Sequence, residues 1–157
     1  LFLNTMADDI IDRLKAEYGK KFSKYQKITA FAELYGPSSF AGTHVADEKK
    51  NLKLFDIFRF KDGFIDPSTF VNIFTETNYV AKALRQCNLN QDLINNVRRG
   101  YTPDDYELPK YQTVPEGVVC KGNESGELWM TKIKTFAYLD KLKGYYGQDW
   151  EKYADDQ

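Results

Sequence analysis

Two short segments near the end of the sequence carry an acid and two cations at spacings that suit phosphate chemistry. The first reads Glu116-Gly-Val-Val-Cys-Lys121, and the second reads Thr131-Lys-Ile-Lys-Thr135. Lys132 and Lys134 are two residues apart, so on a β-strand their side chains share one face. A carboxylate and two ammonium groups delivered from neighbouring strands can hold a polyphosphate and its divalent metal. These residues therefore predict a nucleotidyl-transfer site.

An earlier segment places a carboxylate between two aromatic rings. In Phe31-Ala-Glu-Leu-Tyr-Gly36, strand alternation puts Phe31, Glu33 and Tyr35 on one face. A nucleoside pocket needs an acceptor for the ribose hydroxyls and apolar walls for the base. The alternative is that Glu33 is a solvated residue of an edge strand, which is the usual state of glutamate.

A further candidate pair is Phe55 and Asp56, within Leu54-Phe-Asp-Ile-Phe58. Phe55 can stack on a nucleic-acid base. Alternation puts Asp56 on the opposite face, where it can pair with a cation or a metal. The alternative is that Phe55 packs in the core and Asp56 is solvated.

Two geometric questions concern the later segments. Glu116 and Lys121 are five residues apart, so strict alternation would place them on opposite faces. Both can serve one site if a bulge intervenes or if Glu116 precedes the regular strand. Lys132 and Lys134 can also be solvated lysines that protect a sheet edge, although Ile133 between them indicates that the opposite face is buried.

In order along the chain, these four segments resemble the third to fifth motifs of the covalent nucleotidyltransferases. That superfamily includes ATP-dependent DNA ligases, RNA ligases and mRNA capping enzymes, and the sequence looks most like the phage-type and archaeal RNA ligases. The resemblance covers residues 27–145. The Glu116-Gly-Val-Val element and the Lys132-Ile-Lys134 strand are its most specific parts.

The resemblance implies a role for each matching residue, with ATP and Mg²⁺ as cofactors. Glu33 would bind the ribose, and Phe55 would stack on adenine. Asp56 and Glu116 would support the metal. Lys132 and Lys134 would hold the phosphates, and Lys121 matches the motif's trailing lysine. The reaction would join the 5′-phosphate and 3′-hydroxyl ends of RNA through an enzyme adenylate and an adenylylated RNA, with Lys132, Lys134 and Glu116 catalytic.

The nucleophile motif of that superfamily, Lys-x-Asp-Gly, is missing from this sequence. Lys61-Asp62-Gly63 lacks the intervening residue and is typical of a turn. We therefore expect the C-terminal part of an adenylyltransferase domain, without its N-terminal strands and without an OB-fold domain. Two alternatives remain: a fragment of a DNA-ligase-like enzyme, or a non-catalytic nucleotide- or nucleic-acid-binding module of ligase ancestry.

Composition is ordinary for a single globular domain. The 157 residues are 42 % hydrophobic and 29 % charged, with a net charge of −1, so no overall basic field indicates nucleic acid. Cys87 and Cys120 form no metal-binding spacing, and their number favours a reducing compartment, hence a cytoplasmic location. His44 is the only histidine, so zinc is not expected.

Periodicity predicts the elements that would position these residues. We expect helices over residues 6–24 and 67–77, and two more helices that begin at residues 90 and 138. We expect strands over residues 27–33, 52–60, 116–121 and 127–135. Residues 1–3 would be the tail of a strand, and a strand that begins at residue 64 would pair with 52–60 in a hairpin. The mixture predicts an α+β fold with antiparallel-rich sheets, a partial ATP-grasp-like nucleotidyltransferase domain. Absent N-terminal strands would leave sheet edges open to the missing part of the domain or to self-association.

Overall fold

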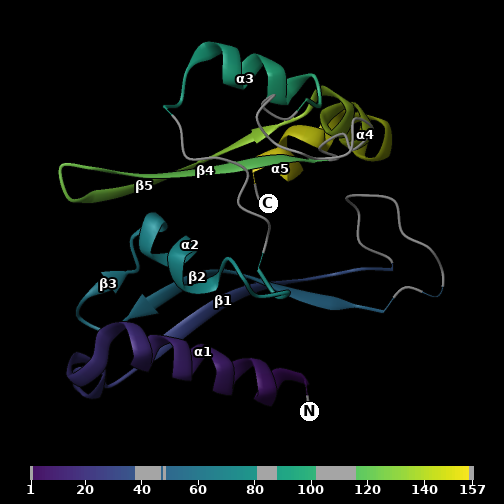
Figure 1. Cartoon of the computed structure of the whole chain (residues 1–157). Coiled ribbons are helices and arrows are strands. Elements are labelled where there is room, and N and C mark those ends of the chain that lie inside the picture. Colours follow the sequence, from purple (N-terminus) through teal and green to yellow (C-terminus); the bar gives the residue numbers. More distant parts are fainter. Residues whose placement is uncertain (1, 38–46, 48, 81–87, 102–115, 156–157) are drawn as a thin grey trace. The chain divides into compact units, whose positions relative to one another are not determined.

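The computed structural model describes residues 2–37, 47, 49–80, 88–101 and 116–155, which belong to two compact units (Figure 1). The first unit contains α1, η1, β1, β2, β3 and α2, together with residues 122–128, and the second contains α3, most of β4 and β5, α4, η2 and α5. Helices and small antiparallel sheets confirm the α+β class. That the chain forms one nucleotidyltransferase domain stays a prediction.

The first helix, α1 (Phe2–Tyr18), begins earlier than expected. Its buried face continues back from Leu14 and Ile10 to Met6 at intervals of four residues, and the helix extends one turn further towards the N-terminus, to Phe2. The strand tail at residues 2–3 and the helix start at residue 6 were therefore wrong. Gly19, with φ of 51°, ends α1, and η1 (Gly19–Lys24) continues as a 3₁₀ helix.

The first unit holds a three-stranded sheet in the order β1-β2-β3, formed by β1 (Ile28–Tyr35), β2 (Asn51–Arg59) and β3 (Gly63–Phe64). Both pairings are antiparallel. The predicted hairpin turn is confirmed, but the positive φ angles fall on Lys61 (72°) and Gly63 (79°) rather than on Asp62.

The core of the first unit lies between β2 and two helices. Leu54 and Ile57 of β2 are fully buried, as are Leu14 of α1 and Phe74 of α2 (Pro67–Phe74). Asp66 caps α2 as predicted, because its carboxylate accepts a hydrogen bond from the Ser68 backbone N–H at 2.9 Å.

The second unit combines a hairpin with helices. Its elements are α3 (Gln91–Arg98), β4 (Gly117–Glu124), β5 (Glu127–Lys134), α4 (Phe136–Tyr146), η2 (Gly147–Asp149) and α5 (Trp150–Asp155). The Asn90 side chain caps α3 by accepting from the Leu93 N–H at 2.8 Å, as expected. Buried apolar side chains in this unit are Val97, Ile133, Tyr138 and Leu142. Within the described ranges no helix is long and apolar enough to cross a bilayer.

Candidate functional site

A β-bulge in β2 decides which side chains share the outer face of the first sheet. Phe31 of β1 pairs with Asp56, but the next residue, Ala32, pairs with Leu54, so Phe55 is the extra residue. Leu54 and Ile57 are three residues apart and are both fully buried, which an unbroken strand does not allow. The bulge therefore lets both residues between them, Phe55 and Asp56, face away from the core.

The outer face carries a cluster of phenylalanine rings. The Phe55 ring lies 6.3 Å from the ring of Phe31, and the Phe64 ring lies 5.8 Å from Phe31 and 5.2 Å from Phe58, all measured between centroids. Phe31, Phe55 and Phe64 keep 38 %, 40 % and 41 % of their surface exposed. A partly exposed aromatic surface of this kind is available for stacking.

Asp56 lies on the same face, contrary to the expectation from alternation. Residues directly opposite each other in an antiparallel pair share a face, and Asp56 is the direct partner of Phe31. The predicted opposite placement of Phe55 and Asp56 is therefore wrong, and the cause is the bulge. The sequence contains no local signal for it, because the irregularity exists only in the pairing with β1.

Glu33 also faces this side of the sheet. It follows Phe31 by two residues in β1, which places the two Cα atoms about 7 Å apart, and it is exposed. Its cross-strand partner is Lys53, whose ammonium donates instead to the Asn78 carbonyl at 2.6 Å. Among the described residues the Glu33 carboxylate has no hydrogen-bond or ion-pair partner, so it can accept from a ligand.

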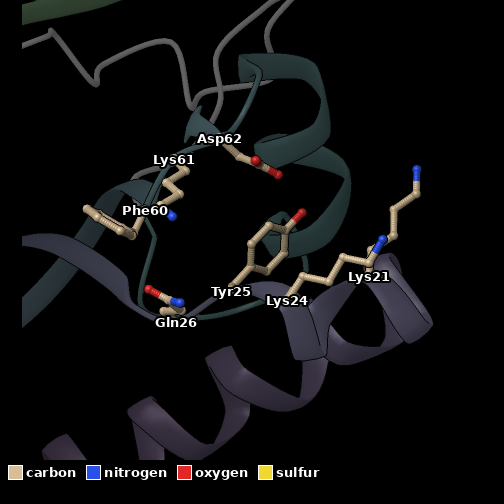
Figure 2. Close-up of a pocket in the computed structure, with 7 residues that line it drawn as sticks. All are labelled: Lys21, Lys24, Tyr25, Gln26, Phe60, Lys61 and Asp62. Atoms are coloured by element: carbon tan, nitrogen blue, oxygen red, sulfur yellow. The ribbon is translucent and has the colours of Figure 1, made fainter.

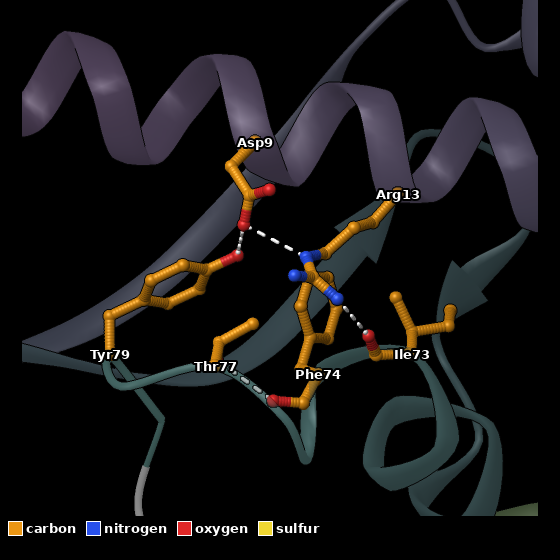
Figure 3. A network of polar contacts seen from close by, with 6 residues as sticks. All are labelled: Asp9, Arg13, Ile73, Phe74, Thr77 and Tyr79. Carbon is orange, nitrogen blue, oxygen red and sulfur yellow. Dashed lines mark hydrogen bonds and ion pairs between the residues drawn. The ribbon is translucent and has the colours of Figure 1, made fainter.

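A polar network fixes the strand that carries the bulge (Figure 3). The Leu54 N–H donates to the Tyr79 carbonyl at 2.6 Å, and the Tyr79 hydroxyl donates to Asp9 of α1 at 2.5 Å. Asp9 also accepts from Arg13 at 2.8 Å, and Arg13 donates to the Ile73 carbonyl at 3.1 Å. The hydrogen bonds from Tyr79 and Arg13 lower the pKa of Asp9, while burial and the Asp9 bond raise the pKa of Tyr79.

In the second unit, Glu116 and Lys132, which the sequence assigned to one site, form an ion pair. The Lys132 Nζ lies 2.5 Å from the Glu116 Oε1, and the two side chains are 30 % and 24 % exposed. The Thr135 N–H donates to the Glu116 carbonyl at 2.8 Å. Glu116 is therefore held by both its main chain and its side chain against the end of β5.

Gly117 allows this close approach. Its φ is 156°, and a Cβ built there would lie 2.0 Å from the Ile133 carbonyl oxygen. Any other residue would push β4 away from β5. The glycine of the Glu-Gly-Val-Val element is therefore needed for the close backbone approach that positions Glu116.

The other two motif lysines lie in the same hairpin. Glu116 precedes β4, which begins at Gly117, so the alternation argument against pairing Glu116 with Lys121 does not apply. Lys121 is half-buried in β4. The Lys134 ammonium donates to the Ala154 carbonyl of α5 and lies 5.7 Å from the centroid of the Tyr138 ring. Lys134 therefore contacts the C-terminal helices rather than Glu116.

The predicted site residues thus gather in two groups. Phe31, Glu33, Phe55 and Asp56 share one sheet face of the first unit, and Glu116 and Lys132 pair in the second. Convergence of the two groups stays a prediction. Cys87 and His44 lie outside the described residues.

The acidic residues suit Mg²⁺ bound together with a substrate rather than a cage made by protein alone. No group of three or more His, Cys, Asp or Glu side chains in the described part of the chain could hold a metal. Mg²⁺ is usually held by one or two carboxylates, substrate phosphates and water. Glu116 and Asp56 each offer one carboxylate, so the donor chemistry fits that mode.

Sequence reasoning missed two positioning residues, Gly117 and Thr135. Thr135 is 1 % exposed, and its hydroxyl accepts from the Tyr138 N–H at 3.1 Å as the N-cap of α4. A threonine immediately before an apolar helical segment is a cap signal that could have placed the start of α4 correctly.

No protein-family model matches the chain, and no curated protein or solved structure matches it either. The assignment of function therefore rests on the residues described above and their geometry.

Proposed function

We propose that this chain is part of an ATP-dependent RNA ligase and binds the adenylate group of the reaction. The observation that supports this most is that Phe55 lies on the face that carries Phe31 and Glu33, where the bulge also places Asp56. Three motif residues from two strands therefore share one exposed surface. A stacking ring beside an unpaired carboxylate suits a nucleoside.

The second unit has charged groups that suit binding of a phosphate. Glu116 holds the Lys132 ammonium in place through the 2.5 Å ion pair, and a fixed cation can stabilise charge that develops on a phosphoryl oxygen. Lys134 and Lys121 are the further cations of this role. Mg²⁺, when bound, would neutralise phosphate charge and orient the phosphoryl oxygens.

The sealing step can be written without a nucleophilic lysine. The 3′-hydroxyl of one strand attacks the adenylylated 5′-phosphate of the other, a phosphodiester bond forms, the bond to AMP breaks, and AMP leaves with its phosphate. Formation of the enzyme adenylate is the step that requires the lysine of the missing motif. The chain can therefore be tested on a substrate that is already adenylylated.

The first test is binding of AMP and ATP to the full chain by calorimetric titration. Replacement of Phe55 by Ala should weaken AMP binding at least ~5-fold, because stacking of a base on an aromatic ring contributes roughly 1–3 kcal/mol. The matched control is Tyr145→Ala, which removes a ring that is 73 % exposed in α4 and should leave binding unchanged. Absence of AMP binding, or equal binding by Phe55→Ala, would contradict the proposal.

The second test separates RNA ligase from the two alternatives. The chain is mixed with Mg²⁺, a 5′-adenylylated strand and a 3′-hydroxyl acceptor, each offered as RNA or as DNA. Sealing of RNA, reduced by Lys132→Ala, supports the proposal. Sealing of DNA alone would identify a DNA-ligase-like fragment, and AMP binding without any sealing would identify a non-catalytic binding module.

A further inference from the structure

An open pocket of about 420 Å³ lies in the first unit (Figure 2), and its lining includes none of the residues assigned to the nucleotide. It is bounded on one side by η1 and the residues that follow it, and on the other by the turn between β2 and β3. Its lining residues are Lys21, Lys24, Tyr25, Gln26, Phe60, Lys61 and Asp62.

The pocket concentrates positive charge in a chain whose net charge is −1. Residues 18–32 contain four lysines and no acid, and Lys61 adds a cation from the opposite wall. Lys21, Lys24 and Lys61 are exposed, and the structure gives none of these three ammonium groups an acidic partner among the described residues. Asp62 is the only acid in the lining.

An exposed aromatic ring accompanies the cations. Phe60 is 46 % exposed, and the Lys61 Nζ lies 5.7 Å from the centroid of its ring. In cation-lined grooves for single strands, the ammonium groups follow the phosphates while aromatic rings stack on the bases.

The walls of the pocket are fixed in advance by Arg59. Its guanidinium lies 5.6 Å from the Tyr25 ring centroid and 5.1 Å from that of Tyr18, and it donates to the Tyr25 hydroxyl at 3.3 Å. It also donates to the Phe64 carbonyl beyond the turn at 3.3 Å. Arg59 thus ties the segment after η1 to the turn, so binding needs little reorganisation.

We propose that this pocket binds single-stranded nucleic acid, with phosphates between Lys21, Lys24 and Lys61 and a base against Phe60. The inference goes beyond the proposed function, which concerns only the adenylate and the reacting ends. Phe60 and the three lysines do not belong to the groups assigned to the nucleotide. The pocket would bind the nucleic acid at a site separate from the residues assigned to the adenylate.

The test is binding of a fluorescent RNA single strand of about 12 nucleotides to the full chain, followed by anisotropy without ATP or Mg²⁺. The triple variant Lys21→Ala, Lys24→Ala and Lys61→Ala should weaken binding at least ~10-fold and reduce the slope of log affinity against log salt by about 2, since each phosphate contact contributes about 0.7. Phe60→Ala should weaken binding at least ~5-fold.

The control triple variant is Lys15→Ala, Lys143→Ala and Lys152→Ala, which removes the same charge from lysines that pair with Asp12, Asp140 and Asp149. It should change affinity less than ~2-fold.

Equal weakening by both triple variants would overturn the proposal, as would unchanged binding by the pocket triple variant. If AMP, or polyglutamate at an equal concentration of charge, displaces the RNA, the pocket is not specific for single-stranded nucleic acid and the proposal is overturned. Because all these variants remove exposed side chains, unchanged circular dichroism and melting confirm that each is folded. The assay contains no ATP, so its outcome is independent of nucleotide binding at Phe55.

Discussion

At the scale of single residues, one glycine decides how closely two strands approach. It is Gly117, since the Ile133 carbonyl occupies the space that a side chain would need. Glu116 depends on this approach, because both of its contacts, to Lys132 and to Thr135, lie at the end of β5.

We expect Gly117→Ala to lower the free energy of unfolding by about 2 kcal/mol or more, because it combines an unfavourable φ with a backbone clash. The same substitution at Gly144, inside α4, meets no atom within 4 Å and should raise stability by about 0.5–1 kcal/mol. Urea unfolding of both variants measures the two values. Equal stability of Gly117→Ala and the wild type would show that β4 does not approach β5 as described.

A second prediction concerns pH and the Asp9–Tyr79 hydrogen bond. The pKa of Asp9 is lowered from 3.8 mainly by this bond, so its contribution is present above 3.8 and is lost as the pH falls through the lowered folded-state pKa. Tyr79→Phe should reduce stability at pH 7 by about 1 kcal/mol and make the loss of stability below about pH 4 shallower.

The control for that variant is Tyr101→Phe, because Tyr101 is 61 % exposed. Its unfolding should follow the wild type at every pH. If the free energy of unfolding of Tyr79→Phe falls as steeply at low pH as that of the wild type, the bond to Asp9 does not form in solution.

At the scale of elements, capping is the feature that local sequence predicted best. Asp66 and Asn90 cap α2 and α3 as expected, since a cap depends on residues two or three positions away. The start of α1, the bulge and the pairing of Glu116 with Lys132 depend on partners in other elements. Phe31 and Asp56 are 25 residues apart, so no local pattern could reveal that Phe55 would be the extra residue.

Thr135 connects the hairpin to α4 and tests this coupling between elements. Thr135→Val removes the hydroxyl that caps α4 and should cost about 1–2 kcal/mol of unfolding free energy, whereas Thr135→Ser keeps the oxygen and should cost less. Chemical denaturation compares the two variants. A loss as large for Ser as for Val would mean that the methyl group, rather than the cap, is what matters.

At the scale of the whole molecule, the sequence contains the residue types of the candidate site, but it predicts their geometry only in part. The sequence suggested candidate carboxylates, rings and lysines, and the structure places one group of them on a sheet face of the first unit and pairs Glu116 with Lys132 in the second. The sequence also lacks the nucleophile motif, and this leads to a test of the chain itself.

We expect the chain alone to form no covalent adenylate. After incubation with Mg²⁺ and radiolabelled ATP, a denaturing gel should show no label on the protein, because no lysine stands in a Lys-x-Asp-Gly setting. A label that survives denaturation and maps to a lysine of this chain would show that another residue serves as nucleophile.

The bulge also makes β2 unusually tolerant of one kind of genetic change. Deleting Phe55 would leave the pairs Ala32–Leu54 and Phe31–Asp56 in place and restore a regular strand, with Leu54 and Ile57 still directed into the core. Deleting Ile57 would instead shift the rest of the strand to the wrong face. Loss of the codon for Phe55 should therefore yield a folded protein with the melting temperature of the wild type but without the Phe55 ring. Loss of the codon for Ile57 should yield an insoluble protein. In-frame deletions across β2, scored for expression and for AMP binding, would show whether the proposed AMP binding needs Phe55 while the fold does not.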